Sequence, residues 1–409
     1  MSRPRSRTPA SGVHSVNEAV VAGTERRRRS TLVYPVVVSR AIVLVAAALG
    51  ALAGPVPGAA RLSLGWLGNL VAASAVRWDA GHYLGLAAHG YDAAGQTVFF
   101  PLYPALIRVV GAALGSDVAA GMALSAGAFV IALVLLHRLT ELELGRRAAD
   151  ATVLLVAFAP LSFFFTAVYT ESLFLALSLG AIYAARRERW AWAAALAALA
   201  TLTRNEGLLL IIPIAIQWAR GSQRRVRQLM WLALVPLALL AFLARLAAYG
   251  YGWLAPFDNE AIPEYGRVST GPIGGVIEAL RAAALGVRGT IAGVPPFHPT
   301  EGGLFSGGFE SIVLLLVLVI AVAALVLTFR KLGPTYGLYA TALLAAGISD
   351  PVRWQPLASL DRYALTMFPL WMAAGAWLSE RRATRIALLF GGAFLAFYSF
   401  EFARGAFIA

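Results

Sequence analysis

A stretch with an unusual density of polar and aromatic residues lies between the first two long apolar runs, at residues 77–92 and 99–104. Within it, Asp79 directly follows Trp78. A carboxylate held among apolar and aromatic groups makes a usable general base. The alternative is an interfacial acid that caps the start of its own helix. We take Asp79 as the candidate catalytic residue.

Aromatic side chains accompany this acid. Their flat apolar faces can stack on the C–H faces of sugars, and a lipid chain can pack beside them. Membrane proteins also gather aromatic residues at the membrane–water interface, which explains some of them without a substrate. The candidate substrate-binding residues of this stretch are Arg77, Trp78, His82, Tyr91, Phe99, Phe100 and Tyr103.

Two further candidates lie at later polar corners. Glu171 follows Thr170 at an expected helix start, where it either caps the helix through the helix dipole or binds a hydroxyl group of a substrate. Arg204 lies between two short apolar runs. An ionisable group near the hydrophobic part of a membrane is costly, so it usually has a function. A guanidinium matches phosphate oxygens in a bidentate way. The alternative for Arg204 is a snorkelling side chain paired with Glu206.

The last two candidates, Arg362 and Tyr363, precede a late apolar run. Arg362 either meets a phosphate or forms an ion pair with its neighbour Asp361 that pins the loop.

The five histidines match no metal-binding signature, and the chain has no cysteine. His82 and His89 are seven residues apart, on one face if the segment is helical, and with Asp79 and Asp92 they could bind a divalent ion, which is the alternative. No phosphate-binding loop or dinucleotide fingerprint occurs, so we expect no metal, no cofactor and no soluble nucleotide donor.

The composition sets the fold class. Of the 409 residues, 59% are hydrophobic and 13% are charged, whereas soluble domains carry about 25% charged residues. We therefore predict an all-α polytopic membrane protein, because backbone groups in lipid must be bonded within helices. The net charge of +13 comes from arginines in short loops, which indicates membrane orientation and no nucleic-acid partner. Lys331 is the only lysine, which together with abundant alanine suggests a bacterial, GC-rich genome and hence a plasma-membrane location.

Apolar runs of about 20 residues predict roughly eleven spans in one transmembrane domain, residues 31–409, behind a disordered basic cytoplasmic tail, residues 1–30. Basic clusters fall on alternate turns, which places the amino terminus inside the cell. Two exterior loops, 54–117 and 249–308, carry interfacial helices expected at 102–114 and 273–285. The predicted spans are 32–53, 118–136, 151–168, 173–185, 190–203, 208–218, 229–248, 309–329, 335–349, 363–379 and 385–402.

Three blocks of this sequence resemble the PIG-V family, which contains the second GPI mannosyltransferase and its bacterial relatives. The first block is Trp78-Asp79, Gly90-Tyr91 and Phe99-Phe100-Pro101, and it is similar to that family's first exterior loop. The second is Pro160 to Phe174 with Thr170-Glu171, and the third is Ala200 to Leu208 around Arg204. A weaker match is Arg362-Tyr363 with Phe368-Pro369. Asn205-Glu206 departs from the Ser-Asn expected in the family.

The resemblance implies a GT-C-like fold and a glycosyltransferase that acts on the exterior face. The implied donor is a polyprenyl-phosphate sugar, with mannose as the hexose, and the implied acceptor is a glycolipid, glycan or protein. Asp79 would be the base of a single displacement, Arg204 and Arg362 would meet the phosphate, and Glu171 would orient the sugar or acceptor. The donor tail would enter from the membrane lipids. A transporter or flippase of lipid-linked sugars is the alternative, and a structural membrane subunit is a third.

Overall fold

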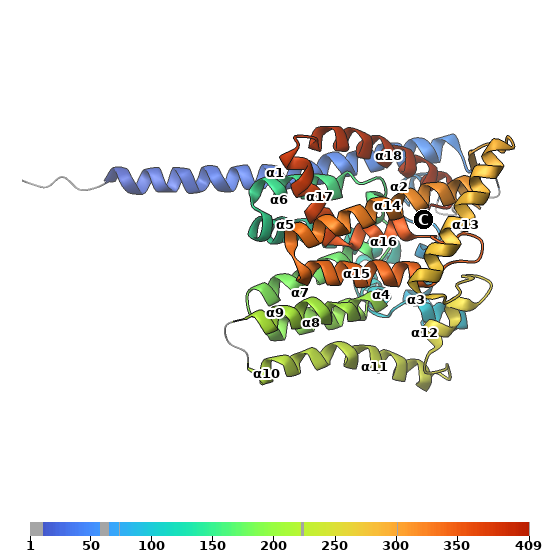
Figure 1. Ribbon diagram of the computed structural model, residues 1–409, viewed down its shortest axis with the longest axis horizontal. Helices are drawn as coiled ribbons and strands as arrows, with labels where there is room; N and C mark the ends of the chain where they lie inside the picture. The colour runs from blue at the N-terminus through green and yellow to red at the C-terminus, as the bar shows by residue number, and fades with distance from the viewer. Residues whose placement is uncertain (1–10, 58–64, 73, 222–224, 301, 409) are drawn as a thin grey trace, which may run out of the picture.

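The structure is a computed structural model that describes residues 11–57, 65–72, 74–221, 225–300 and 302–408. It is a bundle of helices, with one two-stranded antiparallel hairpin, β1 (Phe297–Thr300) and β2 (Gly303–Phe305), among the described residues. Most helices follow the long axis of the molecule, while α3, α12 and α13 gather at one end (Figure 1). The predicted helical fold class is confirmed.

The described helices have the following bounds. The α-helices are α1 (Ser11–Ala53), α2 (Gly65–Ala72), α3 (Asp79–His89), α4 (Leu102–Leu114), α5 (Asp117–Leu144), α6 (Arg146–Ala157), α7 (Glu171–Arg186), α8 (Trp190–Thr201), α9 (Ile211–Arg220), α10 (Val226–Leu229), α11 (Leu234–Ala248), α12 (Ala255–Asp258), α13 (Gly271–Ile291), α14 (Gly307–Leu332), α15 (Pro334–Ser349), α16 (Leu360–Thr366), α17 (Phe368–Glu380) and α18 (Thr384–Arg404). The 3₁₀-helices are η1 (Ala94–Val98), η2 (Ser162–Phe165), η3 (Asn205–Leu210), η4 (Met230–Ala233) and η5 (Asn259–Ala261).

Five helical segments in the described part of the chain are long and apolar enough to cross a membrane. They are 32–53 within α1, then α5, the continuous segment 226–248, α14 and α18. The expected total of eleven spans stays a prediction, because the other apolar helices are shorter.

The amino-terminal segment differs from the expectation. Helix α1 begins at Ser11, so residues 11–30 are helical where the sequence predicted a disordered tail, and residues 1–10 lie outside the described part. The first half of α1 projects beyond the bundle, and its second half packs along α18 (Figure 1). Part of the expected exterior loop 54–117 also lies outside the description, at 58–64 and 73.

The span predicted at 151–168 is wrong in its second half, because α6 ends at Ala157. Pro160 has no N–H to continue a helix and disfavours the helical conformation of the residue before it. The carbonyls that this break frees are met by Arg40 of α1, whose guanidinium donates to Ala157 O (3.3 Å) and Ser162 O (2.7 Å). An irregular, buried segment therefore leads from α6 into the corner before α7.

Two other predicted boundaries are corrected. The span expected at 363–379 is divided into α16 and α17 at Met367, two residues before Pro369. Helix α5 continues past the predicted end at Leu136 to Leu144. His137, expected in a basic loop, is therefore helical and buried, with its Nε2 2.9 Å from Asp150 Oδ1.

The basic turns lie together at the end of the bundle opposite α3, α12 and α13, as side-chain contacts between them show. Glu143 near the end of α5 accepts hydrogen bonds from Arg186 of α7 and from the Tyr336 hydroxyl of α15 (2.9 Å). Arg220 of α9 donates to Thr335 Oγ1 at 2.8 Å. Arg224 of this set lies outside the described residues. The grouping of turns agrees with the predicted alternation, while the side of the membrane that each end faces stays a prediction.

Candidate active site

A cavity of about 680 Å³ opens at the end of the bundle opposite the basic turns. Its walls come from α3, the segment before α4, the corner between α8 and η3, the loop around η5, and the connection from α15 to α16. Eight of the twelve residues predicted from the sequence line it: Trp78, Asp79, His82, Phe99, Phe100, Arg204, Arg362 and Tyr363.

The other four predicted residues do not line the cavity. Three donate hydrogen bonds to main-chain carbonyls: Arg77 to Ala403 (2.6 Å), Tyr91 to Phe99 (2.8 Å) and Tyr103 to Gly121 (3.1 Å). The fourth, Glu171, has a side chain only 1% exposed. Its side chain contacts Arg204 and Arg362, and its expected contact with a substrate hydroxyl stays a prediction.

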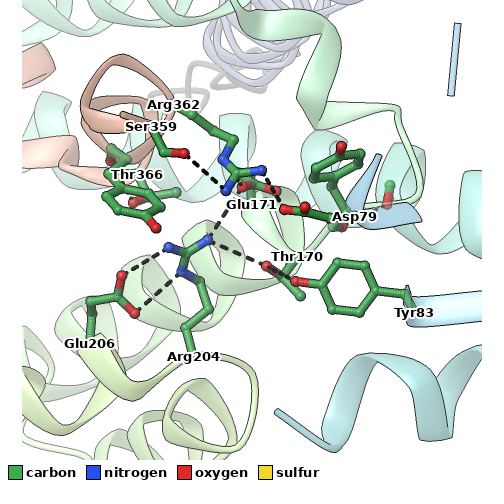
Figure 2. A network of polar contacts seen from close by, with 12 residues as sticks. Asp79, Tyr83, Thr170, Glu171, Arg204, Glu206, Ser359, Arg362 and Thr366 are labelled. Carbon is green, nitrogen blue, oxygen red and sulfur yellow. Dashed lines mark hydrogen bonds and ion pairs between the residues drawn. The ribbon is translucent and has the colours of Figure 1, made fainter. Parts of the chain in front are cut away.

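An alternating row of charges connects Asp79, Arg362, Glu171, Arg204 and Glu206 at the cavity (Figure 2). Asp79 Oδ2 accepts a hydrogen bond from Arg362 Nη1 at 2.7 Å. Glu171 Oε1 lies 3.5 Å from Arg362 Nε and 3.3 Å from Arg204 Nη1. Arg204 then donates from Nη2 to Glu206 Oε1 at 2.9 Å. The single carboxylate of Glu171 thus sets the spacing of two guanidinium groups.

The row replaces one of the alternatives for Arg362, the ion pair with Asp361, and leaves the phosphate contact a prediction. Its guanidinium pairs with Asp79, which is 283 residues away in the sequence, and Ser359 Oγ accepts a further contact at 3.4 Å. The Asp361 carboxylate instead accepts from the main-chain N–H of Arg362 at 2.8 Å. The expected ion pair between these two neighbours is therefore replaced by one that ties the late part of the chain to α3.

Arg204 makes one of its predicted contacts, the pair with Glu206, while its contact with a phosphate stays a prediction. It pairs with Glu206, as one alternative expected, but its side chain is only 13% exposed and also reaches Glu171, so it does not snorkel. Its guanidinium lies 4.9 Å from the centre of the Tyr363 ring. Burial disfavours the charged form of Glu206, but the charge and hydrogen bonds of Arg204 outweigh burial and hold the pKa of this carboxyl below its usual value.

The approach to Asp79 is held in an uncommon backbone conformation. Trp78 has a φ of +53°, which for a bulky residue is a genuine outlier and costs on the order of 1–3 kcal/mol. Its indole N–H donates to Ala406 O at 3.2 Å, and its ring packs edge-on against Phe407 with centroids 5.1 Å apart. The segment after α18 therefore fixes the residue that precedes the candidate base.

The corner that carries Arg204 depends on a glycine. A Cβ atom on Gly207 would lie 2.2 Å from the main-chain nitrogen of Thr201, so only glycine lets η3 close against α8. This close approach places Arg204 in the cavity wall.

Sequence reasoning missed the contribution of the long loop before α13. Arg267 from this loop donates to the Tyr363 hydroxyl at 2.9 Å and lies 3.8 Å from Glu260 Oε2. Burial raises the pKa of Glu260 to about 7. The spacing of these residues in the sequence does not predict their part in the site, because their partners lie on other segments.

His82 lines the cavity on the side of α3. Its Nε2 lies 3.6 Å from Glu264 Oε1, and the imidazole stacks on Phe99 with centroids 4.7 Å apart.

Residues 59–247 match the family model described as mannosyltransferase (PIG-V). The predicted resemblance to the PIG-V family is confirmed. GPI alpha-1,6-mannosyltransferase 2 of Cricetulus griseus is 37% identical over 145 residues, which cover 32% of this chain and 29% of the relative. GPI mannosyltransferase 2 of Yarrowia lipolytica is 34% identical over 115 residues, covering 27% and 32%. The matches thus span about a third of the length of these curated PIG-V relatives.

The PIG-V match includes Asp79, Glu171 and Arg204, and it ends before Arg362. Among solved structures, the apo oligosaccharyltransferase of Archaeoglobus fulgidus superposes with a TM-score of 0.43 at 13% identity, covering 90% of this chain and 56% of that one.

Proposed function

We propose that this protein is a GT-C-type glycosyltransferase that moves a mannosyl unit from a polyprenyl-phosphate donor to an acceptor hydroxyl on the exterior face of a membrane. The observation that carries the proposal is the contact of Asp79 with Arg362 inside a cavity that also contains Arg204. A carboxylate and two planar cations in one site match the two demands of this reaction, which are removal of a proton and acceptance of a phosphate leaving group.

The proposed chemical step is a single displacement. The acceptor oxygen attacks the anomeric carbon of the donor sugar and forms the new C–O bond, while its proton passes to Asp79. The bond between the anomeric carbon and the phosphate oxygen breaks, and polyprenyl phosphate leaves with the electron pair of that bond. The configuration at the anomeric carbon inverts, because only one displacement takes place.

The leaving phosphate is met by the guanidinium groups of Arg362 and Arg204. Each carries five N–H donors, so donors remain for phosphate oxygens beside the carboxylate contacts. Arg362 has a second consequence for the base, because its Nη1 occupies Asp79 Oδ2 at 2.7 Å. A phosphate that draws Arg362 toward itself weakens this ion pair and leaves Asp79 open to the acceptor hydroxyl. Donor binding would therefore precede acceptor binding.

Glu171 acts in this proposal as a positioning residue. It is buried, and its Oε1 lies within 3.5 Å of both guanidinium groups, so its charge keeps the two groups close to each other. Trp78, Phe99 and Phe100 supply apolar wall for the sugar and the first part of the lipid. The rest of the polyprenyl chain would lie in the bilayer, which it reaches between helices, in a bacterial plasma membrane with the amino terminus inside.

The test is donor-dependent transfer by the purified protein in lipid vesicles. Supplied with radiolabelled polyprenyl-phosphate mannose and a cell-envelope glycolipid fraction, the protein should form a labelled product and release polyprenyl phosphate in equal amounts. A flippase would move the labelled donor across the vesicle membrane and form no product. Transport without any transfer, from folded protein, would refute the proposal.

A further inference from the structure

We infer that Trp354, backed by Gly266, forms a stacking platform for a pyranose ring at the wall of the cavity. Trp354 lies in the connection between α15 and α16 and lines the cavity, although 59% of its surface is exposed. The other aromatic residues of the described lining are buried or half-buried. An exposed indole in a polar cavity presents an apolar surface that no part of the protein covers.

One side of the indole is covered by main chain, which holds the ring in place. A Cβ atom on Gly266 would lie 2.2 Å from Cζ3 of Trp354, and 2.9 Å and 3.1 Å from two further atoms of the six-membered ring. Gly266 also has a φ of +59°, in the left-handed region that favours glycine. The glycine thus allows the indole to rest directly on the backbone.

The backbone on both sides of this contact is fixed by pairing between two segments distant in sequence. Arg267 and Val352 form an antiparallel bridge, and the Arg353 N–H donates to Gly266 O at 3.0 Å. The Val268 N–H donates to the carbonyl of Pro351 at 3.0 Å. The main chain next to Trp354 is therefore held by hydrogen bonds between two segments. A side chain that is already held in place loses little conformational entropy when it binds a sugar ring.

Polar groups for the hydroxyls of a sugar share the same cavity. Glu260, Glu264 and Asp350 supply carboxylate oxygens, and Arg267 supplies N–H donors. A pyranose has an apolar C–H face and a rim of hydroxyl groups, so it fits a flat aromatic surface surrounded by such side chains. A peptide or an alkyl chain would use the indole and leave these polar groups unmatched.

This inference deepens the proposed function and rests on it for the identity of the sugar. The ring on Trp354 is either the donor sugar or a sugar of the acceptor, and both share the chemistry described. The rival explanation is that Trp354 belongs to the aromatic belt of the membrane interface. Trp253 is the matched control, because it is 60% exposed in the turn before α12 at the same end of the bundle and does not line the cavity.

The experiment is saturation-transfer difference NMR on the full-length protein in lipid nanodiscs. Methyl α-D-mannopyranoside is the probe, and glycerol is the polyol that lacks a ring. The ring C–H protons of the probe should receive saturation from the wild-type protein. Trp354→Ala should weaken probe binding by about tenfold, since one face of apolar contact is lost. Trp354→Phe should retain most of the binding, and Trp253→Ala should bind as the wild type does.

Several results would overturn the inference: equal saturation in the wild type and Trp354→Ala, equal losses at Trp354 and Trp253, or the same signal from glycerol. Gly266→Ala provides an independent variant, because its Cβ must displace the ring while the indole itself remains. It should lower the ring-proton signal as Trp354→Ala does, and an unchanged signal would count against the platform.

Addition of unlabelled polyprenyl-phosphate mannose identifies the source of the ring. Loss of the probe signal assigns the platform to the donor sugar, and persistence assigns it to a sugar of the acceptor. The outcome is separable from that of the transfer assay. Probe binding that depends on Trp354, without any transfer product, would remove the proposed reaction and leave the platform. Transfer with unchanged KM values in Trp354→Ala would remove the platform and leave the reaction.

Discussion

Replacement of Glu171 by glutamine tests whether one buried carboxylate positions both arginines. Glutamine keeps the size and one acceptor oxygen but removes the charge that lies 3.3 Å from Arg204 and 3.5 Å from Arg362. Removing one partner from a buried ion pair costs about 3–5 kcal/mol. In the variant, Arg362 keeps Asp79 at 2.7 Å and Arg204 keeps Glu206 at 2.9 Å. We therefore expect the free energy of unfolding to fall by an amount at the low end of this range, about 3 kcal/mol.

The Glu171→Gln variant should bind the donor more tightly than the wild type but transfer the sugar more slowly. Without the negative charge, the two guanidinium groups attract a phosphate more strongly, and about 1 kcal/mol of added attraction would lower the donor KM roughly fivefold. Turnover should fall by about 100-fold, because a misplacement of 1 Å at reacting groups costs on that order. The assay is steady-state transfer from polyprenyl-phosphate mannose, expressed per folded molecule, with thermal unfolding recorded on the same samples.

Glu401→Gln is the matched control for the Glu171 variant. Glu401 is also buried, with its side chain 5% exposed, and pairs with Arg404 at 3.1 Å outside the cavity. It should lose stability and keep normal turnover per folded molecule. If Glu171→Gln behaves in the same way, with normal turnover and an unchanged donor KM, the positioning role is refuted and only a structural ion pair remains.

Two further predictions concern the phosphate site and the topology. Arg204→Lys should fold and lose about 10–100-fold in transfer rate, because lysine keeps the charge but cannot hold Glu206 with a planar fork and also face a phosphate; full activity in the lysine variant would remove the phosphate role. Single cysteines placed at Arg147 or Arg382 should be labelled only from the cytoplasm and one at Asp258 only from outside, since basic turns stay inside. The chain has no cysteine of its own to interfere, and exterior labelling at position 147 would contradict the orientation.

The sequence predicts helices well where residues that start and stop helices bound an apolar run. The helix predicted at 102–114 is α4 (Leu102–Leu114), which begins after Pro101 and ends just before Gly115, whose φ is +71°. Prediction of helices from the sequence is wrong where an apolar run is buried but not helical, as in the segment after Ala157. Composition alone cannot separate a buried irregular segment from a buried helix, and Pro160, inside the predicted span 151–168, is the residue that marks the break.

The candidate site was predictable residue by residue but not as a set of contacts. Asp79, Arg204 and Arg362 stand out because ionisable groups are rare in so apolar a chain. Their pairing cannot be predicted from the sequence, because Asp79 and Arg362 are 283 residues apart and meet only when their segments pack together. Arg267 and Trp354 carry no local signal either, since their roles depend on the pairing of two loops.

Turnover by the Asp79→Asn variant is the most direct test of whether Asp79 is the base that removes the acceptor proton. Asparagine has the size of aspartate but cannot accept the acceptor proton, and loss of a positioned base costs about 10²–10⁴ in rate. Donor affinity should be retained, because Arg362 is released from its 2.7 Å contact with the carboxylate and remains available to the phosphate. With Asp79 as the base, we expect a folded variant that binds polyprenyl-phosphate mannose and forms at most about 1% of the wild-type product per unit time. Near-normal turnover in a well-folded Asn variant would contradict it and remove Asp79 from the reaction.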